Sequence, residues 1–244
     1  MIRMIEEMSL NAWPALEVVL CDGWVLRFAD GYTRRANSVN PLYASTGDLS
    51  QKIALCERLY RERGLPVIFK LTRESEPRDL EAALVERGYE RVAQTSVYTS
   101  DLAHGDDPAG IEIETSWARA TEWREAFHRI KPVEGGRREA HDRILASIPL
   151  PTGFTLARED GQVVGCALGV VQGDWLGVFD VVVGEAFRRR GHGERLMKGL
   201  SAWGKAEGAE KAYLQVMREN AAAQRLYQKL GFREAYPYWY RITA

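Results

Sequence analysis

The segment VVVGEAFRRRGHGERLM, Val181 to Met197, passes from a valine-rich strand through three arginines and two glycines into an expected helix. Backbone N–H groups in the first turn of a helix have no partner within it, and the helix dipole places positive charge there. Gly191 and Gly193 carry no Cβ, so the backbone can approach a bound group closely. The segment therefore predicts an anion-binding loop that holds a pyrophosphate.

Two familiar phosphate-binding loops do not fit this segment. A P-loop ends in Gly-Lys-Ser or Gly-Lys-Thr, whereas Gly193-Glu194-Arg195 stands here. The dinucleotide-binding loop requires a third glycine, and Leu196 occupies that position. Both classes are therefore excluded.

The residues around the loop predict alternating strands and helices. We expect strands at 154–159 and 162–171 joined by an Asp160-Gly161 hairpin turn, and a third strand at 175–183. A helix ending near Gly208, a strand at 212–217, a helix capped by Asn220 and a last strand at about 233–242 follow. A helical region at 118–148 is expected to break near Pro132.

Two motifs identify a family resemblance. The pattern Arg/Gln-x-x-Gly-x-Gly/Ala after a valine-rich strand resembles the coenzyme A loop of the GNAT superfamily of N-acetyltransferases. The segment YLQVMRENAAAQRLYQKLGF, Tyr213 to Phe232, resembles the family's strand, capping asparagine, helix tyrosine and Gly-Phe ending. The resemblance covers the chain from about Ile111 onward. It implies an α/β (α+β) fold with a mixed, mostly antiparallel sheet flanked by helices, and acetyl-CoA as the acyl donor.

The resemblance also implies roles for individual residues. The loop would bind the diphosphate, the strand before it would pair with the pantetheine arm, and Asn220 would lie near that arm. Tyr227 would lie at the thioester sulfur and protonate the leaving thiolate. Asn220 could equally be only a helix cap, and Tyr227 only a core residue. The residues expected at the cofactor are Val181, Val183, Arg188, Arg189, Arg190, Gly191, His192, Gly193 and Asn220.

The general base departs from the family pattern. Many relatives place a glutamate in a Leu-Glu-Val context, whereas this chain has Leu214-Gln215-Val216, and glutamine cannot accept the proton. Asp180 is the nearest ionisable candidate, with a structural hydrogen-bonding role as the alternative. A water molecule could relay the proton instead, because alignment of the reactants contributes more than a base does.

The first half carries a fainter copy of the same pattern. Gly64 and Gly88 lie 144 and 143 residues before Gly208 and Gly231. A repeat of this length predicts two related domains in tandem, not a solenoid.

The copy lacks the binding residues. With these offsets Arg188, Gly191 and Gly193 fall on Ala44, Gly47 and Leu49, while Asn220 and Tyr227 fall on Pro77 and Leu84. We therefore predict three parts. Residues 1–102 form a degenerate GNAT-like domain without a CoA site, 103–110 form a linker, and 111–244 form the acetyltransferase domain. Arg34, Arg35 and Asn37 of the first half are candidates to face the acceptor.

Composition excludes several classes of function. The chain has 33 Lys and Arg against 34 Asp and Glu, so no basic field is available for nucleic acid. Its three cysteines are widely spaced, and no histidines have the i,i+4 spacing of helical metal sites. No run of about 18 apolar residues and no signal peptide is present. We expect a cytoplasmic protein without a metal or membrane partner, as a monomer or homodimer.

Three functions remain open at this point. The leading one is an acetyl-CoA-dependent N-acetyltransferase that acts on a small-molecule amine by direct attack in a ternary complex. The second is acetylation of a protein's N-terminal amine, because Tyr213 to Phe232 resembles that branch. The third is a non-catalytic acyl-CoA-binding regulatory module, which Gln215 keeps open.

The degenerate first half predicts the stoichiometry of CoA binding. Leu49 stands where the second loop glycine would be, and Ala44 stands where the arginine would be. We therefore expect isothermal titration calorimetry to give one equivalent of CoA per chain. Two equivalents would contradict the interpretation of residues 1–102.

Overall fold

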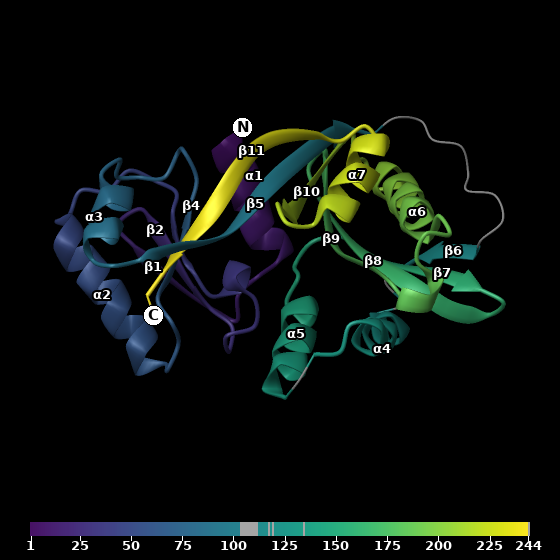
Figure 1. The fold of residues 1–244 in the computed structure, drawn as a ribbon, viewed down its shortest axis with the longest axis horizontal. Coiled ribbons are helices and arrows are strands. Elements are labelled where there is room, and N and C mark those ends of the chain that lie inside the picture. The colour runs from purple at the N-terminus through teal and green to yellow at the C-terminus, as the bar shows by residue number, and fades with distance from the viewer. Residues whose placement is uncertain (103–111, 117, 119, 134, 244) are drawn as a thin grey trace. The chain divides into compact units, whose positions relative to one another are not determined.

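The computed structural model describes residues 1–102, 112–116, 118, 120–133 and 135–243 (Figure 1). The chain forms two compact units that interleave along the sequence. Unit 1 comprises Met1–Ser96, Glu139–Ser147 and Tyr236–Ala244, and unit 2 comprises Val97–Arg138 and Ile148–Ala235. None of the helices in the described part of the chain is long and apolar enough to span a membrane.

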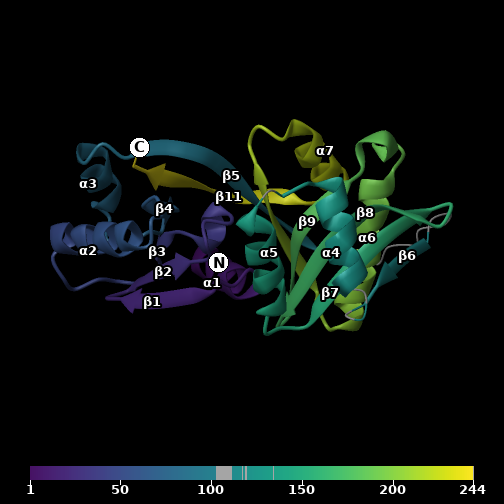
Figure 2. The ribbon, with the colours of Figure 1, turned by 90° about the horizontal axis from the view of Figure 1, so that it is seen from below.

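Unit 1 contains strands in the order β1-β2-β3-β4-β11-β5, with α2 and α3 packed on them (Figure 2). β3 and β4 run parallel, whereas the β1–β2, β2–β3 and β4–β11 pairs are antiparallel. Its elements are α1 (Ile2–Ala12), β1 (Glu17–Cys21), β2 (Trp24–Phe28), β3 (Val39–Pro41), α2 (Leu49–Glu62), β4 (Ile68–Leu71), α3 (Leu80–Glu86), β5 (Glu90–Asp101) and β11 (Arg233–Ile242).

A buried ion pair fixes α1 within unit 1. Glu6 Oε2 and Lys70 Nζ lie 2.5 Å apart, and the two side chains are 1% and 3% exposed. The Tyr236 hydroxyl donates to Glu6 Oε1 at 2.9 Å, and Lys70 Nζ lies 4.1 Å from the ring centroid of Tyr238. Because an unpaired buried charge is strongly destabilising, this group ties α1 to β4 and β11.

The structure corrects one expectation about the loop after β2. Asn37 is 3% exposed, and its side-chain oxygen accepts from the N–H groups of Ala29 (2.8 Å) and Gly31 (3.0 Å). Its amide holds the loop together, so the expectation that it faces an acceptor is wrong. Arg34 is exposed, and the Arg35 guanidinium lies 5.0 Å from the Trp13 ring centroid.

Unit 2 contains strands in the order β5-β10-β9-β8-β7-β6. β9 and β10 run parallel, whereas the β6–β7, β7–β8 and β8–β9 pairs are antiparallel. α4 and α6 both contact β7 and β8, from opposite sides in Figures 1 and 2. Its elements are β6 (Glu112–Thr115), α4 (Ala120–Ile130), β7 (Thr152–Glu159), β8 (Gln162–Gln172), β9 (Trp175–Val183), α6 (His192–Ala206), β10 (Lys211–Met217) and α7 (Ala221–Lys229), while α5 (Gly136–Ala146) falls mostly in unit 1.

The apolar face of α6 anchors the helix on the sheet of unit 2. Leu196, Met197 and Leu200 are at most 1% exposed and share a core with Leu214 and Tyr227. Burial of each such aliphatic side chain stabilises a fold by about 1.5 to 3 kcal/mol. The N-terminus of α6 is therefore held in a fixed position relative to β9 and β10.

The two units exchange their last strands. Residues Tyr236–Ala244 belong to unit 1, where β11 pairs with β4 in the register Tyr240↔Lys70. Conversely, the end of β5 belongs to unit 2, where β5 neighbours β10 and the Leu102 N–H donates to Glu210 O at 2.7 Å. Each half of the sequence thus supplies a strand to the unit built by the other half.

These observations confirm the predicted fold class, with mixed and mostly antiparallel strands flanked by helices. The bounds of the compact units differ from the predicted domains 1–102 and 111–244. Parts of α5 and β11, which lie in the second half of the sequence, belong to unit 1. The predicted linker at 103–110 lies outside the described residues. The absence of a CoA site in the first half stays a prediction.

The strand exchange predicts that neither half of the chain is stable alone. A fragment 1–102 lacks Tyr236, Tyr238 and Tyr240, which are 1 to 3% exposed. Truncation of one buried aromatic residue costs about 3 to 5 kcal/mol, and a typical domain has only about 5 to 15 kcal/mol of stability. We expect fragments 1–102 and 103–244 to show no cooperative thermal transition separately by circular dichroism. Their co-expression should restore it, and an isolated fragment that melts like the whole chain would contradict the exchange.

Candidate active site

A β-bulge interrupts the pairing of β8 with β9. One residue of β8, Ala167, lies opposite two residues of β9, Asp180 and Val181, and Asp180 has a φ of 46°. A bulge bends its strand and increases the local twist. The bulge therefore redirects the last residues of β9.

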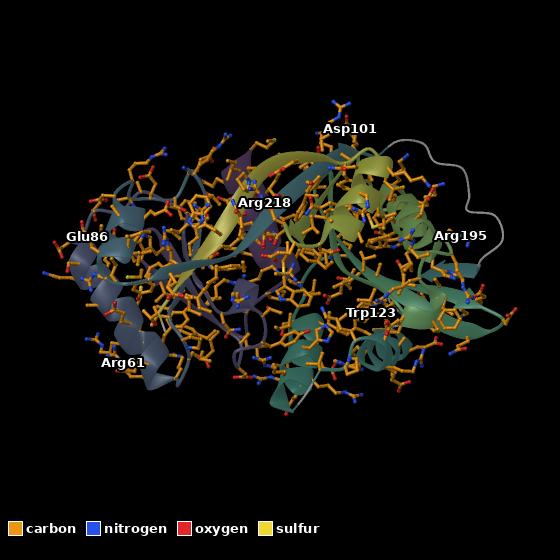
Figure 3. All side chains as sticks on the ribbon, in the orientation of Figure 1. Arg61, Glu86, Asp101, Trp123, Arg195 and Arg218 are labelled. Carbon is orange, nitrogen blue, oxygen red and sulfur yellow. The ribbon has the colours of Figure 1, made fainter. Side chains whose placement is uncertain are left out.

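Trp123 of α4 supports the bulge from one face of the sheet. Its Nε1–H donates to Ala167 O at 2.8 Å, and the side chain is fully buried (Figure 3). The Trp123 ring stacks on Phe127 at a centroid distance of 5.2 Å and meets Phe154 edge-on at 5.6 Å. The indole thus binds the carbonyl of the residue that lies opposite the bulge. No motif in the sequence singles out Trp123, because its partner lies 44 residues away.

The pairing of β9 with β10 ends just before the bulge. Their parallel pairing runs from Trp175↔Lys211 to Val178↔Leu214. It ends there, although both strands continue within the described chain, β9 to Val183 and β10 to Met217. The part of β9 beyond Val178 is therefore the place where an extended ligand could pair with the strand. The predicted residues Val181 and Val183 lie on this segment.

The loop after β9 leads directly into α6. The Gly184 N–H donates to Val164 O at 2.8 Å and ties the start of the loop to β8. Gly191 is the N-cap of α6, with a φ of 85°, and no side chain caps this end of the helix. The Arg195 N–H donates to Gly191 O, so the amides before Arg195 form the first turn. This turn offers its N–H groups to an anion, as the sequence predicts.

The three loop arginines are all exposed. Arg188 Nε donates weakly to Val183 O at 3.4 Å, and Arg190 Nη1 lies 3.4 Å from Glu159 Oε2. Exposed ion pairs of this kind contribute little to stability. Because these contacts are long and exposed, the guanidinium groups of Arg188, Arg189 and Arg190 can reorient toward a bound phosphate.

The His192 imidazole is buried. The side chain is 1% exposed, lies edge-on to Phe187 and places Nε2 3.6 Å from Glu159 Oε2. The expectation that His192 binds the cofactor therefore applies only to its backbone N–H, in the first turn of α6. Sequence alone does not show which way a side chain at this helix position points.

α7 positions the two predicted residues of the second motif. Asn220 caps the helix, and its side-chain oxygen accepts from the Ala223 N–H at 3.1 Å. The Gln224 amide donates to Met217 O (3.3 Å) and Arg218 O (2.8 Å), which fixes the turn before the helix. Asn220 is exposed, so its cap role leaves the rest of its side chain accessible.

Tyr227 lies seven residues after Asn220, on the buried side of α7. Its side chain is 8% exposed and meets Phe232 at a ring-centroid distance of 6.1 Å. Burial raises the pKa of Tyr227 to about 12, because the phenolate would be poorly solvated. The phenol is therefore protonated at neutral pH, which is the form that a proton donor needs.

Comparison with known proteins identifies the family. The profile described as "Probable histone acetyltransferase Rv0428c C-terminal" matches residues 1–241. The chain is also 30% identical over 247 residues to the uncharacterized N-acetyltransferase YobR of Bacillus subtilis, across 99% of this chain and 98% of YobR. The chain belongs to the GNAT family of N-acetyltransferases. This GNAT protein is therefore an acyltransferase.

Solved structures share the fold of this GNAT protein. A GCN5-related N-acetyltransferase from Kribbella flavida matches with a TM-score of 0.70 and 18% identity, over 98% of this chain and 94% of its own. A tandem GNAT protein from the clavulanic acid biosynthesis pathway matches with a TM-score of 0.64 and 13% identity, over 98% and 87%. These matches show that the fold is shared, and the tandem arrangement that the repeat predicts stays a prediction.

The geometry at Gly191 generates a test of the loop. Valine at φ 85° is strained and adds a side chain where the backbone would meet a phosphate. CoA at a hundred times its Kd should stabilise the wild type by about 2.7 kcal/mol, measured as a rise in melting temperature. We expect Gly191→Val to abolish this rise.

Gly208 provides the matched control. It lies beyond the other end of α6, has a φ of 93°, and has open space around the position that a Cβ would take. Gly208→Val should lower the melting temperature but keep the response to CoA. An equal CoA response in Gly191→Val and wild type would overturn the loop assignment.

Proposed function

We propose that this GNAT acetyltransferase moves the acetyl group of acetyl-CoA to the amine of a small molecule by direct attack in a ternary complex. The observation that carries the proposal is the separation of β9 from β10 immediately before the loop of α6. An open strand edge suits the pantetheine arm, and the uncapped helix turn beside it suits the diphosphate.

The residues expected to hold acetyl-CoA follow the chain in order. Val181 and Val183 offer backbone groups to the pantetheine arm, and the loop from Arg188 to Gly193 offers amides and guanidinium groups to the diphosphate. Asn220 stands at the start of α7, and we expect it to lie near the pantetheine arm. We propose that no metal takes part in binding.

Tyr227 is the proposed proton donor. Attack of a neutral amine on the thioester places negative charge on its oxygen, which backbone N–H groups of β9 can stabilise. The departing thiolate then needs a proton, and the Tyr227 phenol, held protonated by burial, can supply it.

The proposed base is Asp180 or a water molecule. An amine with a pKa near 10.4 is neutral in about one molecule in 2500 at pH 7, which costs about 4.6 kcal/mol. Asp180 is partly buried in the bulge, close to the open edge of β9. Gln215, on β10, cannot take the proton. The proton would therefore pass to Asp180 or to a water molecule.

A protein amine is the second candidate acceptor. The description of the matching family names a probable histone acetyltransferase. That activity belongs to the relative, and here it only suggests a protein amine as a possible acceptor. A thiol-release assay with acetyl-CoA and a panel of amines, amino acids and peptides distinguishes the two acceptors. CoA binding without turnover on any amine would instead favour a regulatory module.

Tyr227→Phe tests the proton donor. The variant keeps the ring packed against Phe232 and removes only the hydroxyl. We expect kcat to fall by about 10² to 10⁴, with the melting temperature and CoA affinity unchanged. Tyr213→Phe is the control, because Tyr213 is another buried tyrosine of unit 2, packed edge-on against Phe179.

The core-residue alternative predicts a different pattern. If Tyr227 only packs, Tyr227→Phe retains full turnover, and only Tyr227→Ala does harm, through a cavity that costs about 3 to 5 kcal/mol. A fully active Tyr227→Phe variant would remove Tyr227 from the mechanism.

A further inference from the structure

Asp22 places a carboxylate among donors in unit 1. Asp22 and Gly23 form the two-residue turn between β1 and β2, with φ values of 41° and 83°. The carboxylate accepts from the N–H groups of Thr46 (3.0 and 3.1 Å) and Gly47 (2.8 Å). It also accepts from the hydroxyls of Ser45 (2.8 Å) and Thr46 (3.0 Å). Four donor groups of one loop thus converge on a single carboxylate.

A buried lysine completes the set of donors. Lys52 Nζ lies 3.2 Å from Asp22 Oδ2, donates to Asp22 O at 2.6 Å and also contacts the Ser45 hydroxyl. The Lys52 side chain is 6% exposed and lies over the Trp24 ring at 4.1 Å, whereas the Asp22 side chain is 33% exposed. The cation is therefore fixed inside the protein, and the anion sits at the surface above it.

This loop corresponds to the CoA loop of unit 2. It precedes α2 after β3, and β3 runs parallel to β4, the strand that follows α2. The other loop precedes α6 after β9, which runs parallel to β10 in the same way. Gly47 of the first loop falls on Gly191 of the second by the spacing of the repeat.

We propose that the loop Ser45–Gly47, with Lys52, is an anion site that the Asp22 carboxylate occupies in place of a phosphate. Two backbone amides, two hydroxyls and an ammonium group are the donors that bind a phosphoryl group. Unit 1 therefore needs no ligand at this loop, and its own side chain excludes one. The comparison with unit 2 rests on the proposed function, whereas the anion site does not.

The carboxylate remains charged because its donors favour the anion. The Gly47 N–H and the Ser45 hydroxyl hold the pKa of Asp22 well below its usual range. A depressed pKa stabilises the folded state above the unfolded value of about 3.9, and this contribution is lost as the pH falls below it. The difference in stability between wild type and Asp22→Asn should accordingly shrink on acidification from pH 5 to pH 2.

Removal of the carboxylate should open the site to phosphate. Asp22→Gly leaves a Gly-Gly turn, which suits the hairpin, and frees the donors of Thr46, Gly47 and Lys52. We expect inorganic phosphate to bind Asp22→Gly at least about tenfold more tightly than wild type, measured by its effect on melting temperature at constant ionic strength. Asp22→Gly combined with Lys52→Met should lose this gain.

Asp30→Gly is the matched control. Asp30 and Gly31 form a second Asp-Gly turn of unit 1 with positive φ values of 48° and 70°, but the Asp30 carboxylate pairs with the exposed Arg143 at 2.8 Å. Its variant should respond to phosphate as the wild type does. A phosphate response in Asp22→Gly equal to that of wild type would overturn the proposal.

Two further measurements keep the outcome clear. If Asp22→Gly does not fold, Asp22→Ala carries the same test, because it also removes the carboxylate that fills the loop and leaves Lys52 without a counter-charge. CoA affinity should be equal in wild type and both variants. If neither the wild type nor the variants bind CoA, the proposed function is refuted. The phosphate result would remain valid, because it does not depend on CoA.

Discussion

The early end of the pairing between β9 and β10 is the constraint on which the candidate site depends. The two strands stay together only as far as Val178 and Leu214. A bulge at Asp180 follows directly, and Trp123 donates to the carbonyl of Ala167 opposite the bulge. The same strand then enters the loop of α6, so a single continuous segment provides both the open strand edge and the uncapped helix turn.

Features of the fold and the candidate site that depend on neighbouring residues could be predicted from the sequence. The Asp160-Gly161 turn, the break between α4 and α5 and the Asn220 cap depend on neighbouring residues, and the structure confirms each of them. The bulge, the direction of the His192 imidazole and the exchange of β5 and β11 depend on partners far away in the sequence. Hydrophobic periodicity carries no information about such partners, so these features were missed.

Both units contain the same arrangement of a strand, a loop, a helix and a parallel strand, but the two loops contain different side chains. In each, a loop between a strand and a helix presents amides at the helix N-terminus, and the strand after the helix runs parallel to the one before the loop. In unit 2 the loop carries three exposed arginines and is open. In unit 1 a carboxylate from the first hairpin fills the corresponding loop. On the proposed interpretation, unit 1 would keep the arrangement of an anion-binding loop while one of its own side chains takes the place of the ligand.

The exchange of strands also orders events during synthesis. The Tyr236 hydroxyl meets Glu6 across 230 residues of chain, so α1 cannot reach its final contacts until nearly everything else has been translated. Domains usually fold as units, N-terminal first, as the chain emerges. Here the N-terminal residues cannot pair with β11 until it has been synthesised, and the helices and strands of unit 2 are synthesised before it. Contacts of such long sequence separation form slowly, which makes closure of unit 1 the expected last step of folding and the stage at which a chaperone would find exposed strand edges.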